Sequence, residues 1–298
     1  MRSAVLDVLS RIKAGLPAVH SEPDFSFARH TTIGSGGTAA VALSPSCIEE
    51  AAECIAFLED NAIPYCFLGA GANVLPRDGR FEGAVIRFQR MKMLYMGADY
   101  LYAGAGVTGG ALLNFAEARS ITGFEPLVGI PTTVGGGVAM NAGIADCHFS
   151  DLVRGVVACH SGNIKMFSHE ECLFSLKKSV FLDGIAVLGV YFKMARATQE
   201  EIKARTAHFL ERRKHLPKGR SMGCTFVNPE GLSAGELIDR CGLKGRKIGQ
   251  AHVSEEHANF IINEGTCSED ISRLIDEVKG EVFARSGILL REEVRRVP

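Results

Sequence analysis

The sequence predicts an α+β protein with two domains, and three observations support this prediction. The chain has 298 residues, of which 46% are hydrophobic and 22% are charged, so it holds enough apolar material for more than one core. A strand–helix–strand pattern near the N-terminus indicates an α/β unit. After residue 197 the composition changes, and further helices and a strand follow. We therefore expect domains at residues 1–196 and 197–298.

Composition and charge exclude several classes of protein. The 33 Lys and Arg against 34 Asp and Glu give a net charge of −1, whereas a dedicated binder of nucleic acid or of membrane surfaces carries a basic excess. The nine cysteines include no Cys-x-x-Cys pair, so we expect reduced, mostly buried thiols and no metal site. No apolar stretch approaches the ~20 residues of a membrane span. We expect a cytoplasmic protein without nucleic-acid or membrane partners.

The first domain is expected to begin with a helix, followed by the strand–helix–strand unit. Ala40–Leu43 and Tyr65–Leu68 are short apolar runs typical of buried strands. Between them, Ser46 and Glu49 form the reciprocal cap pattern of a helix start. Further strands are expected at residues 153–159 and 185–192.

The second domain is expected to begin with a polar helix that Thr198 starts and that ends before Pro217. Further helices are expected at Ser233–Cys241 and Ser268–Ser286, and a strand at Ala258–Ile262. Between residues 203 and 220, seven Lys and Arg accompany one Glu. This bias indicates either a solvated helix face or a cluster that holds phosphates.

Glycine is concentrated in one part of the chain, because ten of the 33 glycines fall in residues 101–143. Such a density indicates positive φ angles or a close approach to the main chain. The earlier run Leu68–Leu75 (LGAGANVL) follows a strand, but it lacks the third glycine and the helix of a Rossmann fingerprint. Two interpretations remain: a tight turn, or a concave set of N–H groups suited to phosphate.

The run Gly129–Gly143 (GIPTTVGGGVAMNAG) is the second glycine loop. Its triple glycine, residues 135–137, leaves three residues without side chains, so a flat ring or a pyrophosphate could lie against the main chain. Thr132 and Thr133 offer hydroxyls, and Asn141 offers an amide. Glycine-rich turns also occur without ligands, but two such loops on one α/β scaffold favour a large nucleotide cofactor.

Two features near the C-terminus are candidates for chemistry. Cys224 lies among small and polar residues. A thiol with the ordinary pKa of about 8.5 can donate a proton, one with a lowered pKa is a nucleophile, and a buried thiol is inert. Glu292 and Glu293 are adjacent, so in an extended segment only one of them can point into a site.

Nine segments, taken in order, resemble one family, UDP-N-acetylenolpyruvoylglucosamine reductase (UDP-N-acetylmuramate dehydrogenase, MurB), in its shorter subtype. The similarity covers nearly the whole chain. Besides the two glycine loops, the segments are GAGV (104–107), HTTIGSGG (30–37), FSLKKSVF (174–181), SMGCTFVNP (221–229), AGELIDRCGLKG (234–245), HANFIIN (257–263) and GILLREEVR (287–295).

The resemblance implies an FAD-binding domain of the vanillyl-alcohol-oxidase (PCMH) type, built from two α/β subdomains, and a smaller α+β substrate-binding domain. It implies that NADPH reduces FAD. Hydride then passes from flavin N5 to the β-carbon of the enolpyruvyl group of UDP-N-acetylglucosamine enolpyruvate, and the α-carbon is protonated. The product is UDP-N-acetylmuramate, a peptidoglycan precursor. The partners are then the UDP-sugar and NADPH, and we expect a monomer.

The resemblance also assigns residues. The catalytic positions are Cys224 as proton donor, Glu293 as the carboxylate, and Lys177 where the family has Arg. Asn228 and His257 match positions that contact the sugar nucleotide. Charge alone, rather than the resemblance, indicates that a basic cluster neutralises the diphosphates of NADPH or of the substrate; the cluster is Arg212, Arg213, Lys214, Lys218 and Arg220. FAD is expected at the two glycine loops, on Gly69, Ala70, Gly71, Ala72, Asn73, Val74, Gly129, Pro131, Thr132, Thr133, Gly136, Gly137, Asn141 and Gly143.

The catalytic arginine position is the main departure from the family pattern. The pattern Phe-x-Tyr-Arg-x-Ser-x-Phe is FSLKKSVF here, with Leu176 and Lys177 in the Tyr and Arg positions. Lysine keeps the charge but loses the two-pronged grip on a carboxylate, so we expect weaker stabilisation of the substrate dianion, or help from Lys178 or Arg291. Two alternatives stay open: a flavin oxidase or dehydrogenase of small hydroxy acids on the same scaffold, and a catalytically weakened flavin-binding relative.

Overall fold

The computed structural model describes residues 2–144 and 147–298, with side chains from Val8 onward. The chain forms two compact units. The first contains the residues up to Pro23, Ala40–Ala70 and Glu82–Lys214, and the second contains Asp24–Ala39, Gly71–Phe81 and His215–Pro298. The two compact units are discontinuous in the sequence and do not test where one domain ends and the next begins. The boundary between residues 196 and 197 therefore stays a prediction.

A four-stranded sheet and two helices contribute to the first hydrophobic core. Its strands lie in the order β1 (His20–Ser26), β2 (Thr38–Ser44), β5 (Arg80–Ile86) and β3 (Tyr65–Phe67). Helices α1 (Arg2–Gly15) and α3 (Ile48–Asp60) add Ile12, Ile55 and Leu58 to the core. The strand–helix–strand prediction is confirmed. The helix start was predicted wrongly, because Cys47 is the N-cap and Ser46 donates to Glu50 rather than pairing with Glu49.

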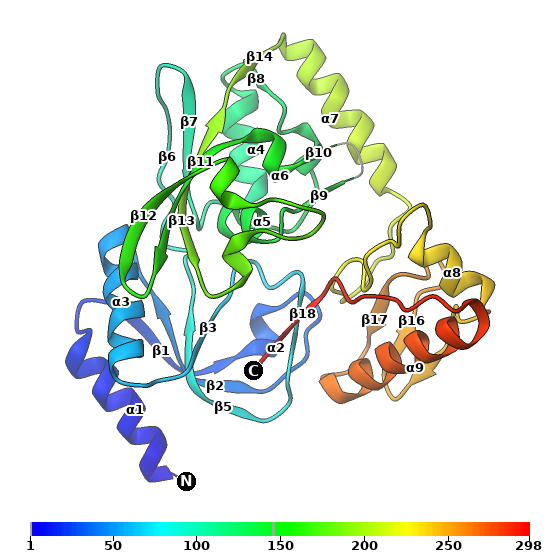
Figure 1. Cartoon of the computed structure of the whole chain (residues 1–298), viewed down its shortest axis with the longest axis horizontal. Coiled ribbons are helices and arrows are strands. Elements are labelled where there is room, and N and C mark those ends of the chain that lie inside the picture. The colour runs from blue at the N-terminus through cyan, green and yellow to red at the C-terminus, as the bar shows by residue number, and fades with distance from the viewer. Residues whose placement is uncertain (1, 145–146) are drawn as a thin grey trace. The chain divides into compact units, whose positions relative to one another are not determined.

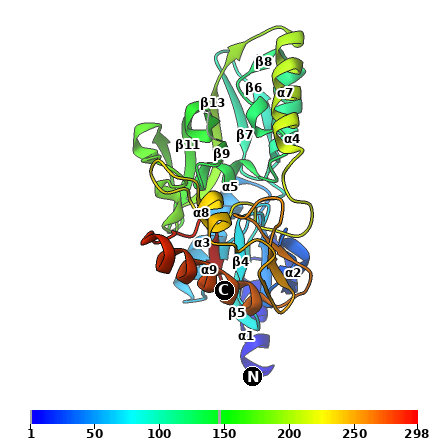
Figure 2. The same ribbon diagram turned by 90° about the vertical axis from the view of Figure 1, so that its right-hand side faces the viewer.

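A second core lies on an antiparallel five-stranded sheet. Its order is β12 (Asn163–Ser168), β11 (Val153–His160), β13 (Ala186–Lys193), β7 (Tyr100–Gly104) and β6 (Leu94–Met96). Helices α4 (Gly109–Glu117) and α5 (Val134–Ala139) cover one face (Figures 1 and 2). The strands predicted at residues 153–159 and 185–192 are confirmed as β11 and β13. Two separate cores are what a domain of two subdomains requires.

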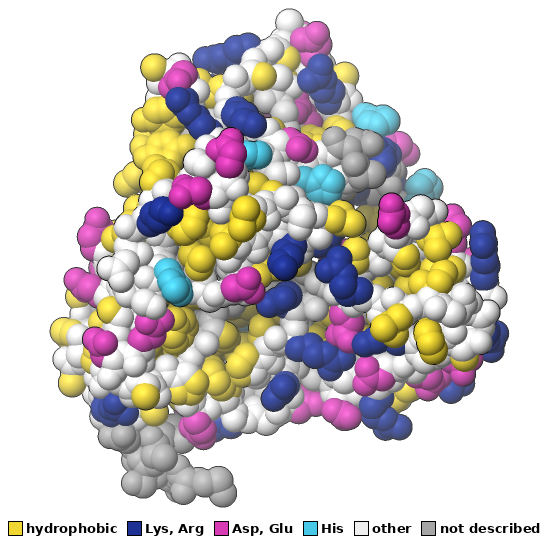
Figure 3. Space-filling view, in the orientation of Figure 1, with side chains coloured by type: hydrophobic (Ala, Val, Ile, Leu, Met, Phe, Trp, Pro, Cys, Tyr) yellow, Lys and Arg dark blue, Asp and Glu magenta, His cyan; other side chains and the backbone are white. Residues whose placement is uncertain are grey.

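Four of the chain's five tyrosines gather on β6, β7 and β13 of this sheet. Tyr95, Tyr100, Tyr102 and Tyr191 pack ring against ring, with centroids 5.0–6.2 Å apart. Met93 precedes them and is 66% exposed. Figure 3 shows hydrophobic side chains gathered over this edge of the sheet. The sheet therefore keeps an apolar surface in contact with solvent.

The remaining elements of the first unit are short, apart from the 15-residue helix α7. They are β8 (Ile121–Thr122) paired with β14 (Ala195–Arg196), β9 (Gly143–Ile144) paired with β10 (Cys147–His148), α6 (Phe149–Leu152), α7 (Gln199–Arg213), and 3₁₀ turns at Glu125–Leu127, Glu170–Cys172 and Val180–Leu182. Thr198 caps α7, as predicted, and Glu201 completes the capping box.

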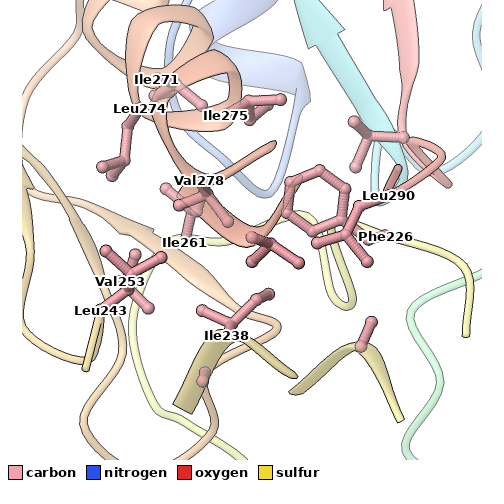
Figure 4. Packing of buried hydrophobic residues seen from close by; sticks show 14 of the residues in the cluster. Phe226, Ile238, Leu243, Val253, Ile261, Ile271, Leu274, Ile275, Val278 and Leu290 are labelled. Atoms are coloured by element: carbon pink, nitrogen blue, oxygen red, sulfur yellow. The ribbon is translucent and has the colours of Figure 1, made fainter. Parts of the chain in front are cut away.

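The second unit packs helix α9 over a small sheet. Its elements are α2 (Phe27–His30), β4 (Val74–Pro76), α8 (Ala234–Arg240), β15 (Lys247–Ile248), β16 (Ala251–Val253), β17 (Ile261–Asn263), α9 (Ser268–Ser286) and β18 (Arg295–Val297), with β18 parallel to β4. Figure 4 shows Leu274 and Val278 of α9 on the side of the helix that faces Val253 and Ile261, and Phe226 belongs to the same cluster of buried residues. The apolar face of α9 therefore closes the core of this unit.

Several expectations for these segments can be compared with the structure. Helices 233–241 and 268–286 are confirmed as α8 and α9. The strand predicted at Ala258–Ile262 begins too early, because a turn closed by Phe260 N–H and the His257 carbonyl precedes β17. The expectation that most cysteines are buried is wrong: four of the nine are, namely Cys54, Cys159, Cys172 and Cys241. Among the described helices, none has the length and apolarity to cross a membrane.

An ion-pair group ties the C-terminal segment to α9. Lys279 Nζ lies 3.1 Å from Glu292 Oε1, and Arg296 Nε lies 3.0 Å from Oε2. The Glu292 side chain is only 18% exposed. Burial alone raises the pKa of Glu292, but hydrogen bonds from Arg296 and Lys279 outweigh it and lower the pKa from its ordinary 4.5.

We expect Glu292→Gln to lower the free energy of unfolding by about 1 kcal/mol at pH 7. A carboxyl whose pKa is lower in the folded chain stabilises it above the unfolded pKa, and the contribution is lost as the pH falls through the folded pKa. The difference between variant and wild type should therefore shrink below about pH 4.5, as measured by urea unfolding. Glu264→Gln, in an exposed pair with Lys247, is the control with little effect. A difference that grows in acid would contradict this account.

Candidate active site

The two glycine loops meet in the first unit. A side-chain carbon on Gly69 would lie 2.8 Å from Thr133 Oγ1 and 3.6 Å from the Cα of Gly136. Gly69 and Ala70 of the first loop therefore lie against the start of α5, which the second loop forms. The remaining residues of the first loop, Gly71–Val74, belong to the second unit, where the Gly71 carbonyl accepts from Thr32 N–H at 3.0 Å.

The second loop is a short helix held close to its neighbours. Thr133 is the N-cap of α5, and its hydroxyl accepts from Gly136 N–H at 3.4 Å. Gly135 N–H donates to the Ala105 carbonyl of the GAGV segment at 3.0 Å. A side chain on Gly137 would collide with the ring of Phe149, which is fully buried. Gly135 and Gly137 thus allow close packing against their neighbours. A side-chain carbon on Gly136 would have only the Thr133 hydroxyl near it.

The other predicted residues of this loop have different surroundings. Pro131 is exposed, and the Thr132 hydroxyl donates to the Thr133 carbonyl at 2.9 Å. Gly129 has φ +69° and lies beside the guanidinium of Arg213 at the end of α7. The C-terminal end of α7, part of the basic cluster, therefore lies over the second glycine loop. Lys218 and Arg220 of the same cluster belong to the second unit.

Lys177 lies in a tight turn in the first unit. Lys178 N–H donates to the Ser175 carbonyl at 3.1 Å, and Ser175 N–H donates to the Lys178 carbonyl at 2.9 Å. Lys177 is the third residue of this turn and has φ +57°, a left-handed conformation that costs a side-chain-bearing residue free energy. Its ammonium lies 3.2 Å from the carbonyl oxygen of Gly143, at the end of the second glycine loop.

In the second unit, Cys224 and Glu293 lie on adjoining extended segments. Glu293 N–H donates to the Thr225 carbonyl at 2.8 Å, and Val227 N–H donates to the Arg291 carbonyl at 2.9 Å. Successive residues of an extended segment point to opposite faces. Because Glu292 is held by Lys279 and Arg296, Glu293 points to the other face. The half-buried Glu293 side chain therefore lies on the face opposite to the ion pairs of Glu292.

The first glycine loop ends beside Glu293. Asn73 Nδ2 donates to the Glu293 carbonyl at 3.1 Å, and the Asn73 carbonyl accepts from Arg295 N–H at 2.9 Å. From the next residue, Val74, β4 runs parallel to β18. The structure therefore brings Asn73 and Glu293 together, although 220 residues separate them in the sequence.

Asn228 and His257 both lie at the start of α8. Asn228 Oδ1 accepts from Ala234 N–H at 3.0 Å, and the ring of His257 lies beside Gly235. Burial lowers the pKa of His257, so the imidazole is neutral at pH 7, and its Nδ1 accepts from Asn259 N–H at 3.2 Å. Arg220 is exposed and lies against Gly34 of the HTTIGSGG segment.

Comparisons with known proteins identify the family. A model of an FAD binding domain matches residues 39–162, and a model of the UDP-N-acetylenolpyruvoylglucosamine reductase C-terminal domain matches residues 214–297. The reductase of Rickettsia felis is 37% identical over 291 residues, covering 95% of this chain and 98% of that protein. This chain belongs to the UDP-N-acetylenolpyruvoylglucosamine reductase family. The predicted family, an oxidoreductase with an FAD-binding domain, is confirmed.

Two further relatives match this chain over almost their full length. The reductase of Geobacter metallireducens is 35% identical over 297 residues, covering 98% of each chain. The crystal structure of the reductase from Thermus caldophilus has a TM-score of 0.81 at 34% identity, covering 94% of this chain and 99% of that one. The predicted fold, an FAD-binding domain followed by a smaller C-terminal domain, is confirmed.

The residues of the two glycine loops are chemically suited to FAD. In the described part of the chain, none of the backbone N–H groups of residues 69–72 donates a hydrogen bond, and such a run of free donors suits a diphosphate. Gly136, which lies against Gly69 in the first unit, presents main chain without a side chain. Asn141 differs from this expectation, because its amide is used within the chain: Nδ2 donates to the Ser175 carbonyl and Oδ1 accepts from Ser150 N–H.

Sequence reasoning missed two residues beside Cys224. Asn259 is buried and bonds both the N–H and the carbonyl of Phe226, at 2.9 and 2.8 Å, while its own carbonyl accepts from Thr225 N–H. It therefore holds the segment that carries Cys224. Thr225 is 1% exposed, and its hydroxyl bonds to no described residue. The signal for Asn259 is an amide inside the apolar run HANFIIN, and Thr225 gives no such signal.

Two glycine-to-alanine variants test whether glycine is required at a position because a neighbouring group lies too close for a side chain. We expect Gly137→Ala to lower the free energy of unfolding by about 1–3 kcal/mol, because its methyl group meets the buried Phe149 ring. Gly110 in α4 is exposed with nothing within 4 Å, so Gly110→Ala should raise stability by up to about 1 kcal/mol. Urea unfolding followed by circular dichroism measures both. Equal effects of the two changes would refute the packing argument.

Proposed function

We propose that this chain catalyses the NADPH-dependent reduction of UDP-N-acetylglucosamine enolpyruvate to UDP-N-acetylmuramate in peptidoglycan precursor synthesis. The observation that carries the proposal is the extent of the family match. The FAD-domain match includes both glycine loops, and the C-terminal match includes Cys224 and Glu293. Lys177 lies between the two matched ranges. FAD, when bound, supplies the two-electron transfer between NADPH and the substrate.

The glycine loops would hold FAD. The free N–H groups of residues 69–72 would face its diphosphate, and the main chain at Gly136 would lie against its ring system, where a side chain would obstruct it. Arg213, which lies over Gly129, would add positive charge for a phosphate group. Asn228, His257 and Arg220 are proposed to bind the sugar nucleotide.

Three residues would act on the reacting group. Hydride addition to the β-carbon pushes negative charge onto the substrate carboxylate, and the ammonium of Lys177 would stabilise that charge as it develops. The Cys224 thiol would give its proton to the α-carbon, and solvent would reprotonate the sulfur. Glu293 would hold a second exchangeable proton in the site. A thiol is more acidic than a serine hydroxyl, so cysteine suits this donor position.

The test of the function is an anaerobic stopped-flow experiment. The purified protein should be yellow, NADPH should bleach it, and the enolpyruvyl sugar nucleotide should restore the colour. Cys224→Ala should still be bleached by NADPH but should regain its colour about 100-fold more slowly or worse, because the carbon lacks its acid. Cys224→Ser is the matched control and should retain most of the rate. Normal reoxidation of Cys224→Ala would remove the proton-donor role, and reoxidation by oxygen but not by substrate would favour an oxidase.

The adjacent glutamates provide a second matched pair. Glu293→Gln keeps the size and hydrogen-bonding atoms of the side chain but cannot hold or transfer a proton, so reoxidation by substrate should slow about 10-fold or more. Glu292→Gln should reoxidise as the wild type does, because Glu292 is held by Lys279 and Arg296. The same absorbance trace measures both rates. If Glu292→Gln proved the slower variant, the assignment of Glu293 would be wrong.

A further inference from the structure

Both the backbone and the side-chain ammonium of Lys177 are held by hydrogen bonds, although the side chain is long and flexible. Its backbone is left-handed at φ +57° within a turn closed by two hydrogen bonds. The hydrogen bond from its ammonium to the Gly143 carbonyl is 3.2 Å long. Left-handed non-glycine residues persist only where the surrounding structure enforces them. Contacts around the turn must therefore hold Lys177 in its left-handed conformation.

Asn141 is a main contact of the turn. Its side chain is 4% exposed. Nδ2 donates to the Ser175 carbonyl, the oxygen that also closes the turn, at 3.0 Å, and Oδ1 accepts from Ser150 N–H of α6 at 2.9 Å. The amide thus joins the Lys177 turn to α6 from inside the protein. Asn141 itself has φ +42°, a conformation that asparagine tolerates better than most residues.

The same short segment holds both parts of Lys177. Asn141 binds its turn through a side-chain amide, and Gly143, two residues later, binds its ammonium through a carbonyl. Lysine needs such support more than arginine does. Its charge is a single point on a flexible four-carbon chain, whereas the planar guanidinium of arginine is preorganised to grip a carboxylate.

We propose that Asn141 is a positioning residue for Lys177. It fixes the turn from which the ammonium reaches the substrate, and it acts through Lys177 rather than on the substrate or on FAD. The inference rests on the proposed function, because it takes the role of Lys177 in stabilising the substrate dianion as given. It also replaces the expectation that the Asn141 amide binds FAD.

Two variants remove the amide contact in different ways. Asn141→Gly keeps a backbone that tolerates φ +42° without strain and loses the whole amide. Asn141→Asp keeps an oxygen for Ser150 N–H and loses the donor to the Ser175 carbonyl. If Asn141→Gly failed to fold, Asn141→Asp would decide the question. Asn61→Ala is the control, because Asn61 also bonds a backbone carbonyl through its amide, that of Phe57 at 2.8 Å, but at the end of α3.

The experiment measures flavin reduction by NADPH and reoxidation by the enolpyruvyl sugar nucleotide separately, in the complete FAD-loaded protein. We expect both Asn141 variants to be reduced at the wild-type rate, within about twofold, and to reoxidise about tenfold more slowly or worse, because the ammonium is misplaced. In a Lys177→Ala background, Asn141→Gly should cause no further loss, because the two residues act as a unit. Asn61→Ala should leave both rates unchanged.

Three results would overturn the inference. The first is wild-type reoxidation in the Asn141 variants. The second is a further loss in the Lys177→Ala background of the same size as the loss in the wild-type background. The third is a fall in flavin content or in the rate of reduction by NADPH, which would return Asn141 to FAD binding. Failure of the wild-type protein itself to reoxidise with substrate would overturn the proposed function, and the inference with it, and is recognised without any variant.

Discussion

The first unit depends on one constraint: two chain segments must approach so closely at the start of α5 that no side chain fits between them. Gly69 lies against the Thr133 hydroxyl, Gly135 against Ala105, and Gly137 against the buried ring of Phe149. These contacts hold the glycine helix on the five-stranded sheet. They also leave Gly136 with open main chain next to Gly69, whose N–H donates to no described residue. Close packing and a surface suited to FAD are therefore consequences of the same short sequence.

The end of this glycine loop has a second use. After α5 the chain passes through Asn141 and Gly143, and their amide and carbonyl hold the turn and the ammonium of Lys177. The loop that is proposed to hold the cofactor thus also holds the cation that is proposed to act on the substrate. Lysine lacks the preorganised fork of an arginine, and the left-handed turn restricts the directions in which the Lys177 side chain can leave the backbone.

In the second unit, the pleat of an extended segment decides which carboxylate is available. Lys279 and Arg296 hold Glu292 toward α9, so Glu293 points to the opposite face. Asn73 bonds the Glu293 carbonyl, and Asn259 holds the backbone beside Cys224. The proposed proton donor and the proposed carboxylate therefore lie on extended segments that buried or half-buried amides hold in register.

The sequence by itself determined most strands and helices and the two glycine loops, because hydrophobic period, caps and glycine content are local properties. It determined the family and its fold through the resemblance of nine segments to known members. Boundaries set by neighbouring contacts were missed: Cys47 rather than Ser46 caps α3, and a turn delays β17 until Ile261. Only the tertiary structure decided which glycines serve packing, which glutamate is committed to an ion pair, and that Asn141 bonds the Lys177 turn. Each of these depends on a partner far away in the chain, and a sequence does not show which distant residues become neighbours.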